Sequence, residues 1–134
     1  MNNKKLMIEI NNTLEELNKI TEKIIQCAFQ VSNTLGIGFL ERVYENSIAL
    51  ELRALGLSVK QQAPILVNYK ENVVGEYSAD LLVENSVLVE LKAVKNLDDI
   101  HLAQCLNYLK ATGFKICLLL NFGTKRIQIK RIIN

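Results

Sequence analysis

Residues 80–92 read DLLVENSVLVELK, and this stretch decides the fold because it places charged side chains inside two segments that otherwise resemble buried strands. The segments 73–83 and 87–92 are rich in leucine and β-branched residues, which favours strands. Asp80 lies in the first segment, and Glu90 and Lys92 lie in the second. A buried carboxylate must be paired, bound to a metal or protonated. We therefore expect these three side chains to form a site.

The loop between the two strands determines whether the acids meet. With a three-residue loop at 84–86, Asp80 directly faces Glu90 across an antiparallel pair. Lys92 then shares their face, because side chains alternate along a strand. A two-residue loop would shift the register by one residue and separate Asp80 from Glu90, unless a bulge restored the pairing. We predict the three-residue loop.

Two carboxylates at this separation repel each other unless one is protonated or a divalent cation lies between them. Hard oxygen ligands favour Mg²⁺ or Mn²⁺ over zinc. A lysine beside the pair, as Lys92 would be, positions or deprotonates a water or stabilises charge on a phosphate. Asp80, Glu90 and Lys92 are therefore suited to phosphodiester hydrolysis.

The segments on either side of this hairpin predict a single mixed α/β domain. Residues 13–16 fit a helical capping box, so a helix is expected from Thr13 to Gly36, and helical spacing continues from Val43 to Gly56. The remaining expected elements are a strand over 59–69, a helix over 100–112 capped by Asp98 or Asp99, and strands over 115–122 and 127–132. The order is helix, helix, three strands, helix, two strands. We interpret residues 1–12 as an N-terminal arm and 13–134 as the domain.

The composition limits the function classes. A chain of 134 residues has room for one domain, and a formal net charge of +2 is too small to indicate a polyanion partner by itself. No apolar run approaches the roughly 20 residues of a membrane-spanning helix, so no membrane contact is expected. Cys27, Cys105 and Cys117 fit neither a disulfide framework nor a zinc pattern. We expect a cytoplasmic protein with reduced, buried thiols.

Asp80 followed by Glu90-x-Lys92 resembles the signature of the PD-(D/E)XK nucleases. Ala79 departs from that signature, which has proline before the aspartate, although this proline is often missing in the superfamily. Alone, the spacing from Asp80 to Lys92 would be a weak signal. Other motifs strengthen it.

Residues 38–44, GFLERVY, match the motif that names the GxxExxY protein family, a branch of the same superfamily. Gln104-x-x-x-Tyr108 matches the Q-x-x-x-Y helix of that family. The resemblance runs from about Ile24 to Ile132, with three motifs in the right order. It implies a restriction-endonuclease-like fold, in which a central mixed sheet is flanked by helices.

The resemblance also implies roles for individual residues. Glu41, Asp80 and Glu90 would bind Mg²⁺ or Mn²⁺, Lys92 would act on the water or the phosphate, and Gln104 would lie beside them. Residues assigned to contact with nucleic acid are two tyrosines on the motif helices and the densest basic cluster of the chain: Tyr44, Tyr108, Lys125, Arg126, Lys130 and Arg131. Tyrosines at such positions are more often half-buried core residues that brace the acids, and a charged strand end is usually just solvated.

Two functions remain open from the sequence. The leading interpretation is a metal-dependent nuclease that hydrolyses DNA or RNA, which the intact Asp80, Glu90 and Lys92 favour. The alternative is a catalytically idle nuclease-fold module that binds nucleic acid or a protein partner. The low net charge and the absence of an evident aromatic stacking platform favour the alternative. A homodimer or a protein partner would then supply the missing affinity.

Overall fold

The computed structural model describes residues 3–134, and the side chains of residues 3–5 and 13–134. The described chain forms a mixed α/β fold in the predicted order of elements. These are α1 (Asn3–Leu35), α2 (Glu41–Ala54), β1 (Val59–Tyr69), β2 (Asn72–Val83), β3 (Val87–Lys92), α3 (Asp99–Thr112), β4 (Ile116–Asn121) and β5 (Gln128–Ile133). The fold class expected from the sequence is therefore confirmed.

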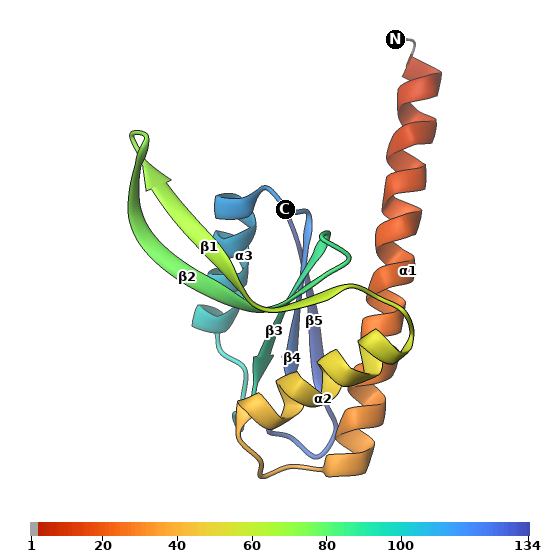
Figure 1. Ribbon diagram of the computed structural model, residues 1–134, viewed down its shortest axis with the longest axis vertical. Helices are drawn as coiled ribbons and strands as arrows, with labels where there is room; N and C mark the ends of the chain where they lie inside the picture. The colour runs from red at the N-terminus through yellow and green to blue at the C-terminus, as the bar shows by residue number, and fades with distance from the viewer. Residues whose placement is uncertain (1–2) are drawn as a thin grey trace.

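The five strands form one sheet with the order β1-β2-β3-β4-β5. Strands β3 and β4 are parallel and are connected through α3, whereas all other neighbours are antiparallel. Helices α1 and α2 pack on one face of the sheet and α3 packs on the other (Figure 1). Every residue of β4 is buried, as expected for a central strand covered on both faces.

Alternation along β3 determines which of its side chains reach which helices. Val87, Val89 and Leu91 join the core formed with α1 and α2, whereas Leu88 joins the core formed with α3. Glu90 has the same parity as Leu88, so it belongs to the face that α3 covers. Glu90 is thus enclosed between the sheet and α3.

The hairpin between β2 and β3 has the predicted register. Val83 pairs with Val87, which leaves a loop of three residues. Two of them, Glu84 and Asn85, have φ values of 52° and 50°, in the left-handed region that non-glycine residues adopt mainly in turns. The N–H of Ser86 donates to the carbonyl of Val83 at 3.0 Å and closes the loop. The loop length that brings the two acids together is confirmed.

Helix α1 begins ten residues earlier than the sequence predicts. The helix runs from Asn3 and continues through Thr13, so the capping box expected at Thr13 does not start it. The sequence from residue 3 to 12 contains no proline or glycine, and nothing there interrupts a helix. The boundary expected between residues 12 and 13 falls inside α1, whose N-terminal half projects away from the sheet (Figure 1).

The structure also shows the state of the cysteines and whether a helix could cross a membrane. Cys27, Cys105 and Cys117 are all free and buried, as predicted. Among the described residues, no helix combines the length and the apolar character needed to cross a bilayer.

The chain that follows β3 is fixed by residues at the end of β4. The buried Asn121 side chain accepts a hydrogen bond from the N–H of Val94 at 3.0 Å and donates to its carbonyl at 2.9 Å. The N–H of Phe122 donates to the carbonyl of Lys92 at 2.8 Å. A Cβ atom on Gly123 would lie 2.2 Å from the Val94 carbonyl oxygen, so only glycine fits there. This clamp positions the backbone of Lys92.

Gly123→Ala is expected to lower the free energy of unfolding by about 3 kcal/mol, because the new methyl group overlaps backbone atoms that cannot rotate away. Urea unfolding measures the change. Gly113→Ala is the control, since Gly113 has a positive φ of 80° but an open environment and should lose only about 1 kcal/mol. Equal losses of stability in the two variants would show that the backbone of Val94 can move away from a side chain at position 123.

Candidate active site

Asp80 and Glu90 lie against each other where β2 and β3 diverge. A carboxylate oxygen of Glu90 accepts a hydrogen bond from the N–H of Asp80 at 3.1 Å. In return, a carboxylate oxygen of Asp80 accepts a hydrogen bond from the N–H of Leu91 at 2.8 Å. The last backbone pair of the ladder is Leu81 with Val89, so the two side chains continue the strand pairing. The acids are held by the backbone of both strands.

Burial and mutual repulsion act strongly on Glu90. Only 4% of its surface is exposed. Burial, followed by the charge of Asp80, raises the pKa of Glu90 to about 9, whereas Lys92 has a weaker opposing effect. Without a cation, Glu90 therefore carries a proton at neutral pH. This is one of the two outcomes expected for a crowded pair of carboxylates.

A cleft of about 510 Å³ opens beside Asp80, between the start of α2 and the middle of the β1–β2 hairpin. Glu41 lies in the first turn of α2 and lines the same cleft as Asp80. The remaining lining residues are Phe39, Leu40, Arg42, Glu45, Gln62 and Ala93. The structure thus places two of the three predicted metal ligands on one cleft and the third in contact with Asp80.

The donor set is compatible with a hard divalent cation. Glu41, Asp80 and Glu90 offer carboxylate oxygens, and a cation near the pair would take the place of the proton on Glu90. In the arrangement described for residues 3–134, however, no three acidic, cysteine or histidine side chains already form a group that could hold an ion. Glu41 therefore reaches the cleft of Asp80 without completing a three-acid cluster.

Gln62 is a feature of the cleft that the sequence analysis did not find. It lies on β1 opposite Asp80 and has a φ of 52°, a strained conformation for a non-glycine residue inside a strand. Its side-chain amide donates to Asp80 at 3.2 Å and to Glu45 at 2.5 Å, and its oxygen accepts from the hydroxyl of Ser78 at 2.8 Å. Gln62 thus fixes the orientation of the Asp80 carboxylate.

Glu45 is the second functional candidate that sequence reasoning missed. It is 3% exposed, although it lines the cleft, and it also accepts a hydrogen bond from Gln61 at 2.7 Å. Arg42 forms an ion pair with it at 3.9 Å. One signal was available, because Glu45 follows Glu41 by four residues and so shares its helical face. Gln62 offered no comparable signal, since its conformation is not encoded in its residue type.

Lys92 and Gln104 lie on the side of the pair that α3 covers. Lys92 ends β3 and is half-buried, and its charge acts on Glu90. Gln104 donates a hydrogen bond to the hydroxyl of Tyr108 at 2.9 Å, one turn further along α3. Both Gln104 and Tyr108 line a second, larger groove and not the cleft of Asp80.

Tyr44, which was expected to contact nucleic acid, is instead fully buried in the core. The side chain has 0% exposure and stacks on Phe122 at 4.6 Å between ring centroids. Its hydroxyl donates to the carbonyl of Gly36 at 2.6 Å and accepts from the N–H of Phe39 at 3.3 Å. Tyr44 therefore braces the turn between α1 and α2 that leads to Glu41.

The four basic residues expected to contact phosphates are exposed, but they do not gather beside the acids. Lys125 and Arg126 lie in the β4–β5 loop, and Lys130 and Arg131 lie on β5 at the sheet edge opposite β1. Lys130 and Arg131 are consecutive strand residues and so point to opposite faces. Arg131 donates a hydrogen bond to Asn18 on α1. None of the four lines the cleft of Asp80.

Comparisons with known proteins identify the family of this chain. A family model of the PD-(D/E)XK nuclease superfamily matches residues 18–132. Among solved structures, the chain is similar to an alkaline exonuclease from Laribacter hongkongensis, with a TM-score of 0.49, 13% identity and coverage of 80% of this chain and 76% of that one. A comparison with curated proteins found no match. This family match extends over most of the chain and includes Asp80, Glu90 and Lys92. The chain therefore belongs to the PD-(D/E)XK nuclease superfamily.

Proposed function

We propose that the protein is a divalent-metal-dependent nuclease that hydrolyses phosphodiester bonds in DNA or RNA. One observation carries this proposal. Asp80 and Glu90 are held in contact by reciprocal hydrogen bonds, and Lys92 follows Glu90 by two residues on the same strand. Burial and the charge of Asp80 raise the pKa of Glu90 to about 9, so the pair is strained in a way that a cation would relieve.

In this proposal, Asp80, Glu90 and Glu41 would hold Mg²⁺ or Mn²⁺, which supplies Lewis-acid stabilisation of the phosphate and a more acidic water. Glu90 gives up its proton when it becomes a ligand. The ammonium of Lys92 donates a hydrogen bond to the attacking water or to a phosphate oxygen. Gln62 keeps the Asp80 carboxylate in place during these steps.

We also propose membership of the GxxExxY branch, because each motif residue has a separate structural task. Gly38 has a φ of 110°, which only glycine adopts readily, and it turns the chain into α2. Glu41 is the first residue of α2 and lines the cleft. The Tyr44 hydroxyl holds the preceding turn through its hydrogen bond to the carbonyl of Gly36. Replacing any one of the three would displace or remove the Glu41 carboxylate that lines the cleft of Asp80.

The test is a cleavage assay on single- and double-stranded DNA and RNA with Mg²⁺, Mn²⁺ or EDTA. Wild type should cut only with metal, and Asp80→Ala should lower the rate by at least about 10³-fold. Glu76→Ala, at an exposed position on the same strand, is the matched control and should cut normally.

Cutting that persists in Asp80→Ala would eliminate the assigned site. Binding of nucleic acid or a protein without any cutting by wild type would instead support the idle module. The absence of a ready three-acid cluster among the described residues is the observation that favours this alternative.

A further inference from the structure

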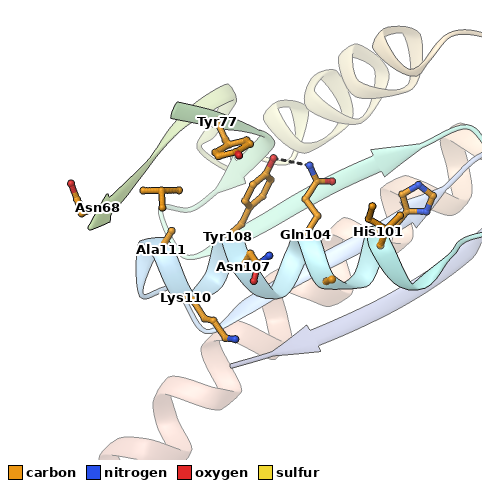
Figure 2. Close-up of a pocket in the computed structure, with 11 residues that line it drawn as sticks. Asn68, Tyr77, His101, Gln104, Asn107, Tyr108, Lys110 and Ala111 are labelled. Carbon is orange, nitrogen blue, oxygen red and sulfur yellow. Dashed lines mark hydrogen bonds between the residues drawn. The ribbon is translucent and has the colours of Figure 1, made fainter. Parts of the chain in front are cut away.

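A groove of about 920 Å³, larger than the cleft of Asp80, runs between the outer half of the β1–β2 hairpin and α3. Val67, Asn68 and Tyr77 form its hairpin side, and its other lining residues all lie on α3. Figure 2 shows the side chains that face this groove. Its volume is at the upper end of the roughly 300 to 1,000 Å³ typical of ligand sites.

Tyr77 provides an aromatic surface at the opening of the groove. Its side chain is 54% exposed, and its ring lies 5.8 Å from the ring of the buried Tyr108 at an angle of 49°. Figure 2 shows Tyr77 beside the phenol of Tyr108, to which Gln104 donates its hydrogen bond. The Tyr77 ring also lies close to Gly75, two residues earlier on β2, where an added Cβ atom would be 3.3 Å from it. Tyr77 is thus an exposed aromatic ring that rests against a second, buried one.

The polar side chains of the groove suit a nucleotide. Asn68, Gln104 and Asn107 offer amide donors and acceptors of the kind that bind base edges, and Lys110 offers a positive charge for a phosphate. Of the described residues that line the groove, none is acidic. An anionic ligand with flat, polar-edged rings is therefore favoured over a basic peptide.

Tyr108 connects the groove to the surroundings of Glu90. Burial raises the pKa of the Tyr108 phenol, and the next contribution comes from the charge of Glu90. Tyr108 and Leu88 belong to the same buried cluster, and Leu88 precedes Glu90 by two residues on β3. A ligand in the groove thus lies on the α3 side of the sheet, the side to which Glu90 belongs.

We propose that this groove binds single-stranded nucleic acid, with one base stacked on Tyr77. Bases in a duplex are already stacked and cannot offer their faces to a tyrosine, whereas a single strand can. The inference rests on the proposed nuclease function and names its substrate class. DNA and RNA share the base-stacking chemistry, so both are tested.

Fluorescence anisotropy tests the proposal with labelled oligothymidylate, oligouridylate and a blunt DNA duplex, in EDTA so that no cutting occurs. Tyr77→Ala should weaken binding of the single strands by about tenfold, the effect of one stacked base. Tyr77→Trp should keep or tighten it. Tyr69→Ala removes another exposed tyrosine of the same hairpin that does not line the groove, and it should change the affinity by less than about twofold.

A second variant does not depend on the contact between Tyr77 and Tyr108. Asn107→Asp places an acid at an exposed groove position and should weaken single-strand binding severalfold by repelling phosphates, whereas the exposed Asn96→Asp should not. Wild-type affinity in both Tyr77→Ala and Asn107→Asp would overturn the proposal. So would an equal loss for the duplex, or no binding of single strands by wild type.

The outcome is separable from that of the nuclease assignment. Metal-dependent cutting without single-strand binding would support the nuclease proposal and show that the groove is not part of its substrate site. Tyr77-dependent binding of single strands without cutting would support the groove as a nucleic-acid site and contradict the nuclease proposal.

Discussion

Lys92→Ala is expected to lower the rate of nucleic-acid cleavage by at least about 10³-fold while the fold remains intact. The side chain is half-buried at the end of β3, two residues after Glu90, and its backbone is held by the N–H of Phe122. It therefore presents a fixed positive charge beside the pair of acids. Alanine removes that charge without filling or opening a core position, so stability should change little.

Single-turnover cleavage at saturating Mn²⁺ measures this effect, and calorimetry measures metal binding by the same variant. Metal affinity should change only modestly, because Lys92 contributes charge to the site and offers no oxygen ligand. Lys95→Ala removes an exposed lysine three residues further and should leave the rate unchanged. A rate for Lys92→Ala close to that of Lys95→Ala would exclude a catalytic role for Lys92.

The part of the site that the sequence predicts is the part controlled by local rules. Loop length and the alternation of side chains along a strand determine that Asp80 meets Glu90, and both can be counted along the chain. Glu41 is found from the GxxExxY motif of residues 38–44, whose spacing is also counted along the chain. These features require no knowledge of which elements pack together.

The features that the sequence does not predict depend on tertiary packing. Gln62 lies opposite Asp80 in a left-handed conformation, which is stabilised only by the amide contacts that the folded structure supplies. Tyr44 is buried because Phe122, far along the chain, covers its ring. Tyr77 rests against a second aromatic ring only because α3 places Tyr108 beside it. Spacing along the sequence carries none of this information.

Glu90→Gln is expected to stabilise the metal-free protein, by an amount that grows as the pH rises from about 4.5 to about 9. Burial and the charge of Asp80 raise the pKa of Glu90 from 4.5 in the unfolded chain to about 9 in the fold. Below pH 4.5 both states are protonated, and the group has no effect on stability. Above it, the folded state binds a proton that the unfolded state has released, so wild type loses stability until the pH passes 9.

Glutamine stays neutral and keeps an oxygen that accepts the N–H of Asp80, so Glu90→Gln avoids this loss. The advantage should be below about 1 kcal/mol at pH 5 and about 5 kcal/mol at pH 8. Urea unfolding in EDTA at several pH values measures it, with the exposed Glu76→Gln as the control. A difference independent of pH would show that Glu90 is not forced to take up a proton on folding.

Metal should make wild type more stable than Glu90→Gln, which reverses the order of stability expected without metal. A cation that binds the ionised acids replaces the proton on Glu90, so Mn²⁺ should stabilise wild type and do so more strongly at higher pH. Glu90→Gln lacks one anionic ligand and should gain much less. If Mn²⁺ stabilises both proteins equally at pH 8, Glu90 is not a metal ligand. The close approach of Asp80 and Glu90 then serves the fold and not metal binding.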